Sequence, residues 1–108
     1  MEEAIRAIAE PNRRRILQLV ASRELSAGEV AAHFDISRPA VSQHLTVLRG
    51  AGLVAERRDG TRRLYSLRPE GFADLRSFLE AFWAEGLERL KEAAENEEGR
   101  RRRGRRAA

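Results

Sequence analysis

The stretch Ser37-Arg-Pro-Ala-Val-Ser-Gln-His-Leu-Thr-Val-Leu48 decides the fold of this 108-residue chain. Ser37 is a typical N-cap residue, and Pro39 follows in the first turn, where its missing N–H leaves no hydrogen bond unmade. Val41, Leu45 and Leu48 recur at helical spacing and predict a buried face. The residues between them are small and polar. The stretch therefore predicts a helix that buries one face and offers the other to a partner.

The residues before this stretch predict three further helices. Ser26-Ala-Gly-Glu29 is a capping box, which opens a short helix that the Phe34-Asp-Ile-Ser37 segment breaks after about two turns. Residues 2–9 carry Ile5 and Ile8 at helical spacing. Pro11 suits the start of a second helix, whose apolar stripe is Ile16, Leu17, Leu19 and Val20. The third and fourth helices then have the length and spacing of a helix-turn-helix.

The residues after it predict a hairpin and a long helix. Gly50-Ala-Gly52 ends the fourth helix, and two strand-like runs, residues 54–58 and 61–67, flank Asp59-Gly60. That dipeptide favours a type I′ turn, which needs positive φ at both residues. Pro69 begins a helix expected over residues 69–94. The order predicts a mainly α fold with a small β-hairpin: a winged helix-turn-helix over residues 1–95, with a disordered Arg-rich tail over residues 96–108.

The polar face of the fourth helix predicts contacts with duplex DNA. A helix in the major groove reads base edges, and Gln can pair with adenine while Arg pairs with guanine. Gln43 is the first choice for base readout, and solvated surface polarity is the alternative. The predicted set on this helix is Ser37, Arg38, Pro39, Ala40, Ser42, Gln43, His44 and Thr46.

The hairpin predicts a second DNA contact. Arg57, Arg58, Arg62 and Arg63 bracket the Asp59-Gly60 tip, so this wing could reach phosphates or a minor groove. Edge-strand charges that prevent aggregation are the alternative interpretation. The Arg13-Arg-Arg15 cluster at a helix start suggests a further anion site.

Four segments resemble the ArsR-type family of bacterial winged-helix repressors. They are Glu10-Pro-Asn-Arg-Arg-Arg-Ile-Leu-Gln-Leu19, Leu25-Ser-Ala-Gly-Glu-Val-Ala31, the opening stretch, and Gly52-Leu-Val-Ala-Glu-Arg-Arg-Asp-Gly60. The resemblance covers about residues 4–90. It implies a homodimeric repressor that dimerises through its first and last helices and occupies an inverted-repeat operator until a signal releases it. It also implies that residues 38–46 are the recognition helix and residues 57–63 the wing.

The residues also predict a dimer face. Helix 69–94 carries more aromatic side chains than one small domain needs, and pairing with a second copy would cover them. An intramolecular core helix is the alternative. The predicted interface is Ile5, Ile8, Leu75, Phe78, Leu79, Phe82, Trp83, Leu87 and Leu90. A two-fold dimer would set the recognition helices about 34 Å apart, which calls for a palindromic operator.

Metal-sensing members of the family use cysteines, or His and acidic ligands on the last helix. This chain has no cysteine and only two histidines, His33 and His44, on different predicted helices. Because zinc normally takes three or four such ligands, we expect no metal site and no cofactor.

The remaining composition bounds the function class. No catalytic constellation is visible, so we expect no enzyme; a winged-helix protein-interaction module is the alternative to a DNA-binding regulator. No apolar run approaches the ~18 residues of a membrane span, and Met1-Glu2-Glu3 is unlike a signal peptide, so we expect a cytoplasmic protein that joins the nucleoid when bound. The net charge of +4 is mainly a tail effect, because the last ten residues hold six arginines and no acid. That tail could be inert, a DNA arm, or a partner for the acidic residues 69–98.

Overall fold

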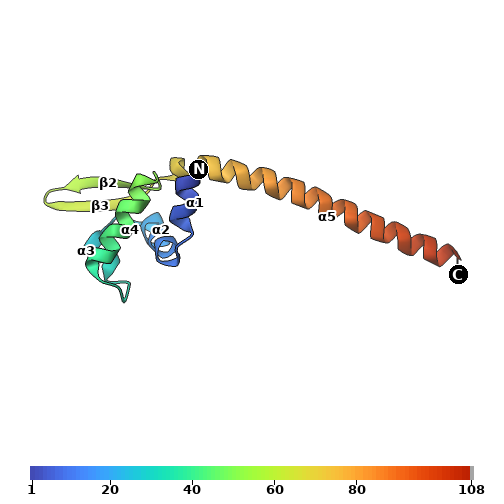
Figure 1. Ribbon diagram of the computed structural model, residues 1–108, viewed down its shortest axis with the longest axis horizontal. Helices are drawn as coiled ribbons and strands as arrows, with labels where there is room; N and C mark the ends of the chain where they lie inside the picture. Colours follow the sequence, from blue (N-terminus) through green and yellow to red (C-terminus); the bar gives the residue numbers. More distant parts are fainter. Residues whose placement is uncertain (108) are drawn as a thin grey trace. The chain divides into compact units, whose positions relative to one another are not determined.

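The computed structural model describes the backbone of residues 1–107 and the side chains of residues 1–104 (Figure 1). The elements are α1 (Glu2–Ile8), α2 (Pro11–Ser22), β1 (Leu25–Ser26), α3 (Ala27–Ala31), α4 (Arg38–Gly50), β2 (Val54–Asp59), β3 (Arg62–Leu67), the 3₁₀ turn η1 (Pro69–Phe72) and α5 (Ala73–Ala107). The chain divides into two units, Met1–Leu75 and the rest of α5, although we expected one domain to residue 95. The predicted winged helix-turn-helix class is confirmed.

Side-chain caps fix where the central helices begin. The Oγ atom of Ser26 accepts from the N–H of Glu29 at 3.2 Å, and the Glu29 carboxylate accepts from the N–H of Ser26 at 3.0 Å. Ser37 caps α4 by accepting from the N–H of Ala40 at 3.2 Å. Both predicted caps are confirmed. They set the axial position of α3 and α4, and with it the residues that face outward.

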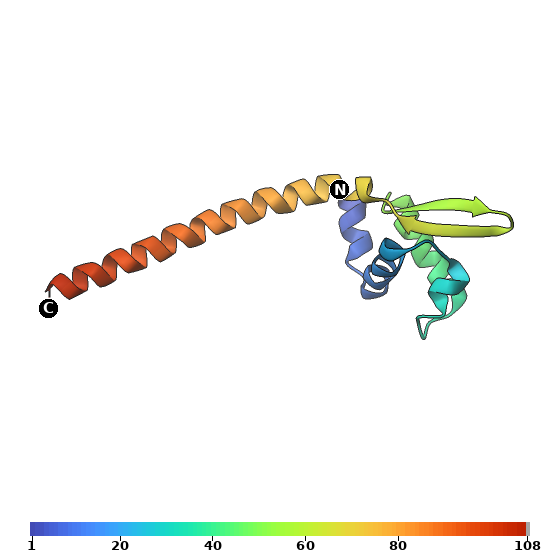
Figure 2. The same ribbon diagram turned by 180° about the vertical axis from the view of Figure 1, so that it is seen from behind.

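The sheet has three antiparallel strands in the order β1-β3-β2, and its β2–β3 hairpin is seen from opposite sides in Figures 1 and 2. The short strand β1 was not expected from the sequence. Asp59 pairs with Arg62, so the two-residue loop is Gly60-Thr61 and the predicted Asp59-Gly60 loop was wrong by one residue. Only Gly60 has positive φ there, +65°, which is the pattern of a type II′ turn rather than type I′.

A single apolar core holds α4 in place. Val41, Leu45 and Leu48 are at most 1% exposed, so the predicted buried face of α4 is confirmed. Tyr65 and Leu67 of β3 pack against this core. The core residues around the α4 stripe come from α1, α2, β1, α3, the turn after α4 and β2: Ala4, Ala7, Ile16, Leu17, Val20, Leu25, Val30, Leu53 and Val54. Burial of this one stripe leaves the polar stripe of α4 in solvent.

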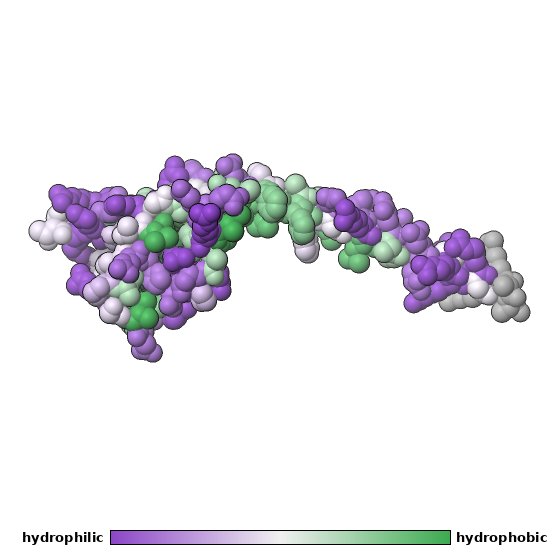
Figure 3. All heavy atoms as spheres, viewed as in Figure 1, coloured by the Kyte–Doolittle hydropathy of each residue, from purple (hydrophilic) through white to green (hydrophobic). Residues whose placement is uncertain are grey.

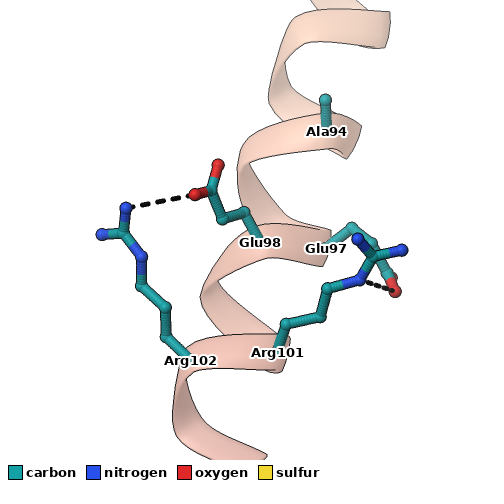
Figure 4. Close-up of a pocket in the computed structure, with 5 residues that line it drawn as sticks. All are labelled: Ala94, Glu97, Glu98, Arg101 and Arg102. Atoms are coloured by element: carbon teal, nitrogen blue, oxygen red, sulfur yellow. Dashed lines mark hydrogen bonds and ion pairs between the residues drawn. The ribbon is translucent and has the colours of Figure 1, made fainter. Parts of the chain in front are cut away.

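The second unit differs from the expectation of a disordered tail. Residues 96–107 continue α5 as helix, and only residue 108 lies outside the described residues. Glu97 and Glu98 pair with arginines one turn later, Arg101 at 3.7 Å and Arg102 at 3.1 Å (Figure 4). A glutamate followed by an arginine four residues later stabilises a helix, and so do cations near its C-terminus. Both effects operate without burial of apolar side chains.

Candidate nucleic-acid interface

The polar stripe of α4 carries most of the predicted recognition residues. Arg38, Ser42, Gln43 and Thr46 are exposed, together with Pro39 at the start of the helix, while Ala40 is half-buried. The hydroxyl of Thr46 donates to the carbonyl of Ser42 at 2.9 Å, so the lone pairs of Thr46 Oγ1 face solvent as acceptors. The amide of Gln43 has no side-chain hydrogen-bond partner among the described residues. The same holds for the side chains of Arg38 and Ser42, so all three are available to an external partner.

Two predicted recognition residues have structural contacts instead. Ser37 is the N-cap of α4. His44 lies toward α2: its Nδ1 is 4.0 Å from a carboxylate oxygen of Glu10 and 3.5 Å from the guanidinium of Arg13. The structure thus separates His44 from the polar stripe that holds Gln43.

An open cleft separates α4 from the wing. Its volume is about 540 Å³. The lining residues come from α4, β3 and the start of α3: Ser26, Ala27, Arg38, Ser42, Thr46, Thr61, Arg62, Arg63 and Tyr65. Three residues of the recognition stripe and two wing arginines, Arg62 and Arg63, therefore line one polar concave surface.

The four wing arginines point to two opposite faces of the hairpin. Arg58 and Arg63 are direct cross-strand partners, whereas Arg57 pairs with Leu64 and Arg62 with Asp59. Because side chains of directly opposed residues share a face, Arg58 and Arg63 lie on one side and Arg57 and Arg62 on the other. The wing is thus not one cluster of four equivalent charges.

Carboxylates of the same chain hold three of these arginines. Arg57 donates through Nε and Nη2 to the two oxygens of Glu24, at 3.0 and 2.9 Å. Arg62 contacts Glu29, and the Nε of Arg63 is 3.4 Å from Glu56. Among the ion pairs of residues 1–104, Arg58 has none, so it is the wing arginine most available to an external anion.

Glu56 is a functional candidate that sequence reasoning missed. Its side chain is 17% exposed and contacts both Arg63 on β3 and Arg49 at the end of α4. It therefore ties the recognition helix to the wing. The hairpin register carries the signal, since Glu56 faces Tyr65 and so stands diagonally across from Arg63. The pairs Glu24–Arg57 and Glu29–Arg62 span 33 positions each, and no local pattern indicates them.

The predicted anion site at Arg13-Arg-Arg15 is wrong. Arg13 donates to the carbonyls of Ala7 and Arg6, at 2.7 and 3.1 Å, and Arg14 to those of Ile8 and Ala9, at 2.8 and 3.0 Å. These carbonyls lie in the last turn of α1 and just after it, where a helix leaves carbonyls short of main-chain donors. Arg15 stacks on the Phe34 ring, 4.4 Å from its centroid. The three arginines therefore stabilise the fold and do not form a site for an external anion.

Glu24 and Glu29 are ionised at neutral pH, because the folded structure lowers the pKa of both carboxyl groups. The pKa of Glu24 is lowered first by the hydrogen bonds from Arg57. The pKa of Glu29 is lowered first by the main-chain N–H of Ser26 and further by the charge of Arg62. Glu24 in turn raises the pKa of Arg57. Each pair is therefore a full positive charge beside a full negative one.

The predicted dimer residues fall into two groups. Leu75 is 8% exposed and Ile8 packs against the core, so a single chain already covers most of both. Ile5 is 37% exposed, and six large apolar side chains of α5 are 46–68% exposed: Phe78, Leu79, Phe82, Trp83, Leu87 and Leu90. Figure 3 shows hydrophobic side chains gathered along the first half of this helix and hydrophilic ones toward its end. The rings of Phe78 and Phe82 stack with centroids 6.4 Å apart.

Two negative findings apply to the described residues. No group of three or more His, Cys, Asp or Glu side chains there could hold a metal ion. None of the described helices combines the length and apolarity needed to cross a membrane.

Comparison with known proteins identifies regulators. Residues 10–56 match the pattern of bacterial regulatory proteins of the arsR family. The chain is 48% identical to the HTH-type transcriptional regulator Rv2034 of Mycobacterium tuberculosis over 80% of each chain. It is 40% identical to the transcriptional repressor SdpR of Bacillus subtilis, over 62% of this chain and 74% of that one. The solved homodimeric winged helix-turn-helix DNA-binding domain of Mb0332 from Mycobacterium bovis is 31% identical, covers 81% of each chain and has a TM-score of 0.62.

Proposed function

The chain belongs to the arsR family of bacterial regulatory proteins, and on that premise we propose that it is a homodimeric repressor that binds an inverted-repeat operator. It is a transcriptional regulator and not an enzyme. A repressor among its relatives and a homodimeric DNA-binding domain among its structural neighbours support the two finer statements. The proposal places the protein in the cytoplasm, on nucleoid DNA when bound.

One observation carries the proposal: a capped helix buries Val41, Leu45 and Leu48 and so exposes a polar stripe, part of which shares a cleft with the basic wing. A slim polar face of this kind fits the major groove, where each good bidentate pair discriminates bases by about 1–3 kcal/mol. We assign base readout to Gln43, with Arg38, Ser42 and Thr46 beside it. Arg58 is then the principal phosphate contact of the wing.

We propose further that α5 and α1 form the dimer interface. The exposed apolar residues of α5 and Ile5 gain by burial against the same residues of a second copy. The interface would involve no metal. Support for that comes from the absence of cysteine in the sequence and of any metal cluster among the described residues. The release signal would then act by another route than metal binding in this chain.

Selection of duplexes from a random pool with the purified full-length protein tests the function. We expect enrichment of an inverted repeat whose half-sites lie one DNA turn apart, about 10 base pairs, or a multiple of it. Gln43→Ala should relax base preference at one position in each half-site. Gln18→Ala is the matched control, because Gln18 is an exposed glutamine of α2. A pool with no inverted repeat would overturn the proposal and favour a protein-interaction module.

A further inference from the structure

Two wing arginines are already occupied by carboxylates that lie outside the wing. Glu24, in the segment between α2 and β1, binds Arg57 through both of its oxygens. Glu29, in the first turn of α3, contacts Arg62. Each arginine side chain remains about half exposed, at 55%. DNA phosphate can therefore reach these groups, but only in competition with a carboxylate of the protein.

The Glu29 carboxylate is fixed independently of the wing. Its Oε1 atom accepts from the N–H of Ser26 at 3.0 Å, as one half of the capping box of α3. The same oxygen receives Arg62. Rigid anchoring in the helix-turn-helix means that the negative charge stays in place whether or not Arg62 leaves it. Arg62 therefore always has a competing anion nearby.

Such competition acts mainly on sequence-independent binding. Non-specific affinity for duplex DNA comes almost entirely from phosphate contacts that release counterions. An arginine whose charge is cancelled by a neighbouring carboxylate releases fewer of them. In a specific complex, base contacts by α4 hold the wing against the backbone, and exposed ion pairs are weak enough to be exchanged there.

We propose that Glu24 and Glu29 are specificity-determining residues, which restrain Arg57 and Arg62 and so weaken binding to DNA without an operator. They provide specificity by weakening the binding of DNA that lacks the operator, and not by strengthening the binding of the operator. Both carboxylates are charged at neutral pH, for the reasons given above. The inference rests on the proposed DNA-binding function, and it adds two acidic residues to a site so far described by its basic and polar ones.

The double variant Glu24→Gln/Glu29→Gln tests the restraint. Glutamine keeps an oxygen acceptor, and it also serves in a capping box, so α3 keeps its N-terminus. Glu80→Gln/Glu85→Gln is the matched control, because it removes two carboxylates that pair with Arg76 and Arg89 within α5. Thermal unfolding first checks that all three proteins are folded. Binding to a mixed-sequence duplex is then titrated with NaCl.

We expect the Glu24/Glu29 variant to bind the mixed-sequence duplex about tenfold more tightly than the native protein. Its plot of log affinity against log salt should steepen by about 0.9 for each arginine that gains a phosphate. Binding to the selected operator should change less, so the ratio of specific to non-specific affinity falls. The α5 control should match the native protein in slope.

Three results would overturn the inference. An unchanged salt slope would mean that Arg57 and Arg62 reach phosphate with their carboxylates in place. Weaker binding by the variant would mean that Glu24 and Glu29 position the arginines for DNA. If the α5 control gained as much affinity, the effect would come from the change in net charge and not from the release of Arg57 and Arg62. A native protein that binds no duplex at any salt concentration would instead overturn the proposed function itself.

Discussion

The two units of this chain are stabilised in opposite ways. In Met1–Leu75, apolar residues from α1 to β3 share one core, and ion pairs such as Glu24–Arg57 join residues 33 positions apart. From Arg76 to residue 104, where the side chains are described, α5 buries no residue, and its ion pairs link residues three or four positions apart. The first unit is specified by its own long-range contacts. The second relies on local helical terms and leaves its apolar stripe uncovered.

The difference matters because local terms alone are weak. Each ion pair one turn apart stabilises a helix by about 0.2–0.5 kcal/mol, and isolated helices are marginal in water. Full burial of one large apolar side chain contributes about 1.5–3 kcal/mol. A helix with six such side chains exposed therefore has much more to gain from a partner than from its own charges. The comparison predicts that α5 and the first unit respond differently to similar substitutions.

The largest effect is expected from charges placed on the apolar stripe of α5. Phe82→Glu/Leu90→Glu should raise the dimer dissociation constant by about 100-fold or more, because each chain then buries two carboxylates without partners. Both residues are about two-thirds exposed in the single chain, so the first unit should stay folded. Sedimentation at several protein concentrations measures the shift, and circular dichroism checks the fold.

Ser77→Glu/Ala84→Glu is the matched control for this variant. By the 3.6-residue period, both positions lie on the other side of α5 from Phe82 and Leu90. The control adds the same two charges and should leave the dissociation constant almost unchanged. If both variants stay dimeric, the apolar stripe of α5 is not the dimer interface, and its exposure needs another explanation.

A pair of glycine substitutions gives the next largest effect, with opposite signs in the two units. A Cβ at Gly71, in η1, would stand 1.8 Å from the carbonyl oxygen of Gly52, so backbone must move. We expect Gly71→Ala to destabilise the first unit by about 1–3 kcal/mol. A Cβ at Gly99, within α5, meets nothing within 4 Å. Gly99→Ala should stabilise the helix there by about 0.5–1 kcal/mol.

Denaturant unfolding measures the Gly71 variant, and helix content by circular dichroism measures the Gly99 variant. Unaltered stability of Gly71→Ala would show that η1 does not pack against the end of α4 as described. Unaltered helix content of Gly99→Ala would favour the disorder that the sequence predicts for residues 96–108.

Local chemistry explains which parts of the structure were predictable. Ser26 and Ser37 fix their helices through bonds to residues three positions on, so their roles can be read from short patterns. The loop at Gly60-Thr61 was misplaced because Asp59-Gly60 also suits a tight turn, and only strand pairing decides between them. The sequence predicts disorder over residues 96–108 because no apolar residue there can be buried, whereas the structure describes residues 96–107 as helix with local ion pairs.

The candidate site likewise has one part that the sequence predicts and one part that it does not. The buried stripe of α4 predicted the exposed position of Gln43, since a helix that hides one face must show the other. The state of the wing arginines was not predictable, because Glu24 and Glu29 meet them only in the folded chain. The sequence shows which surface residues are charged, whereas the tertiary fold decides which opposite charges lie beside them.

The smallest effect concerns those long-range pairs and is expected in the pH dependence of stability. Folding lowers the pKa values of Glu24, first through Arg57, and of Glu29, first through Ser26. A lowered pKa stabilises the folded state fully above the ordinary glutamate pKa of about 4.3, and this stabilisation is lost as the pH falls through the lowered values. The native protein should therefore lose stability on acidification.

The variant Glu24→Gln/Glu29→Gln isolates this contribution, because glutamine does not titrate. Thermal unfolding should show it slightly less stable than the native protein at pH 7, with a gap that closes as the pH falls below about 4. The gap is small because the Glu24 and Glu29 side chains are 39% and 46% exposed, so water screens their ion pairs. A gap that is the same at both pH values would mean that lost hydrogen bonds, and not lost charge, separate the two proteins. The long-range pairs of the first unit would then contribute to stability through their hydrogen bonds and not through their charges.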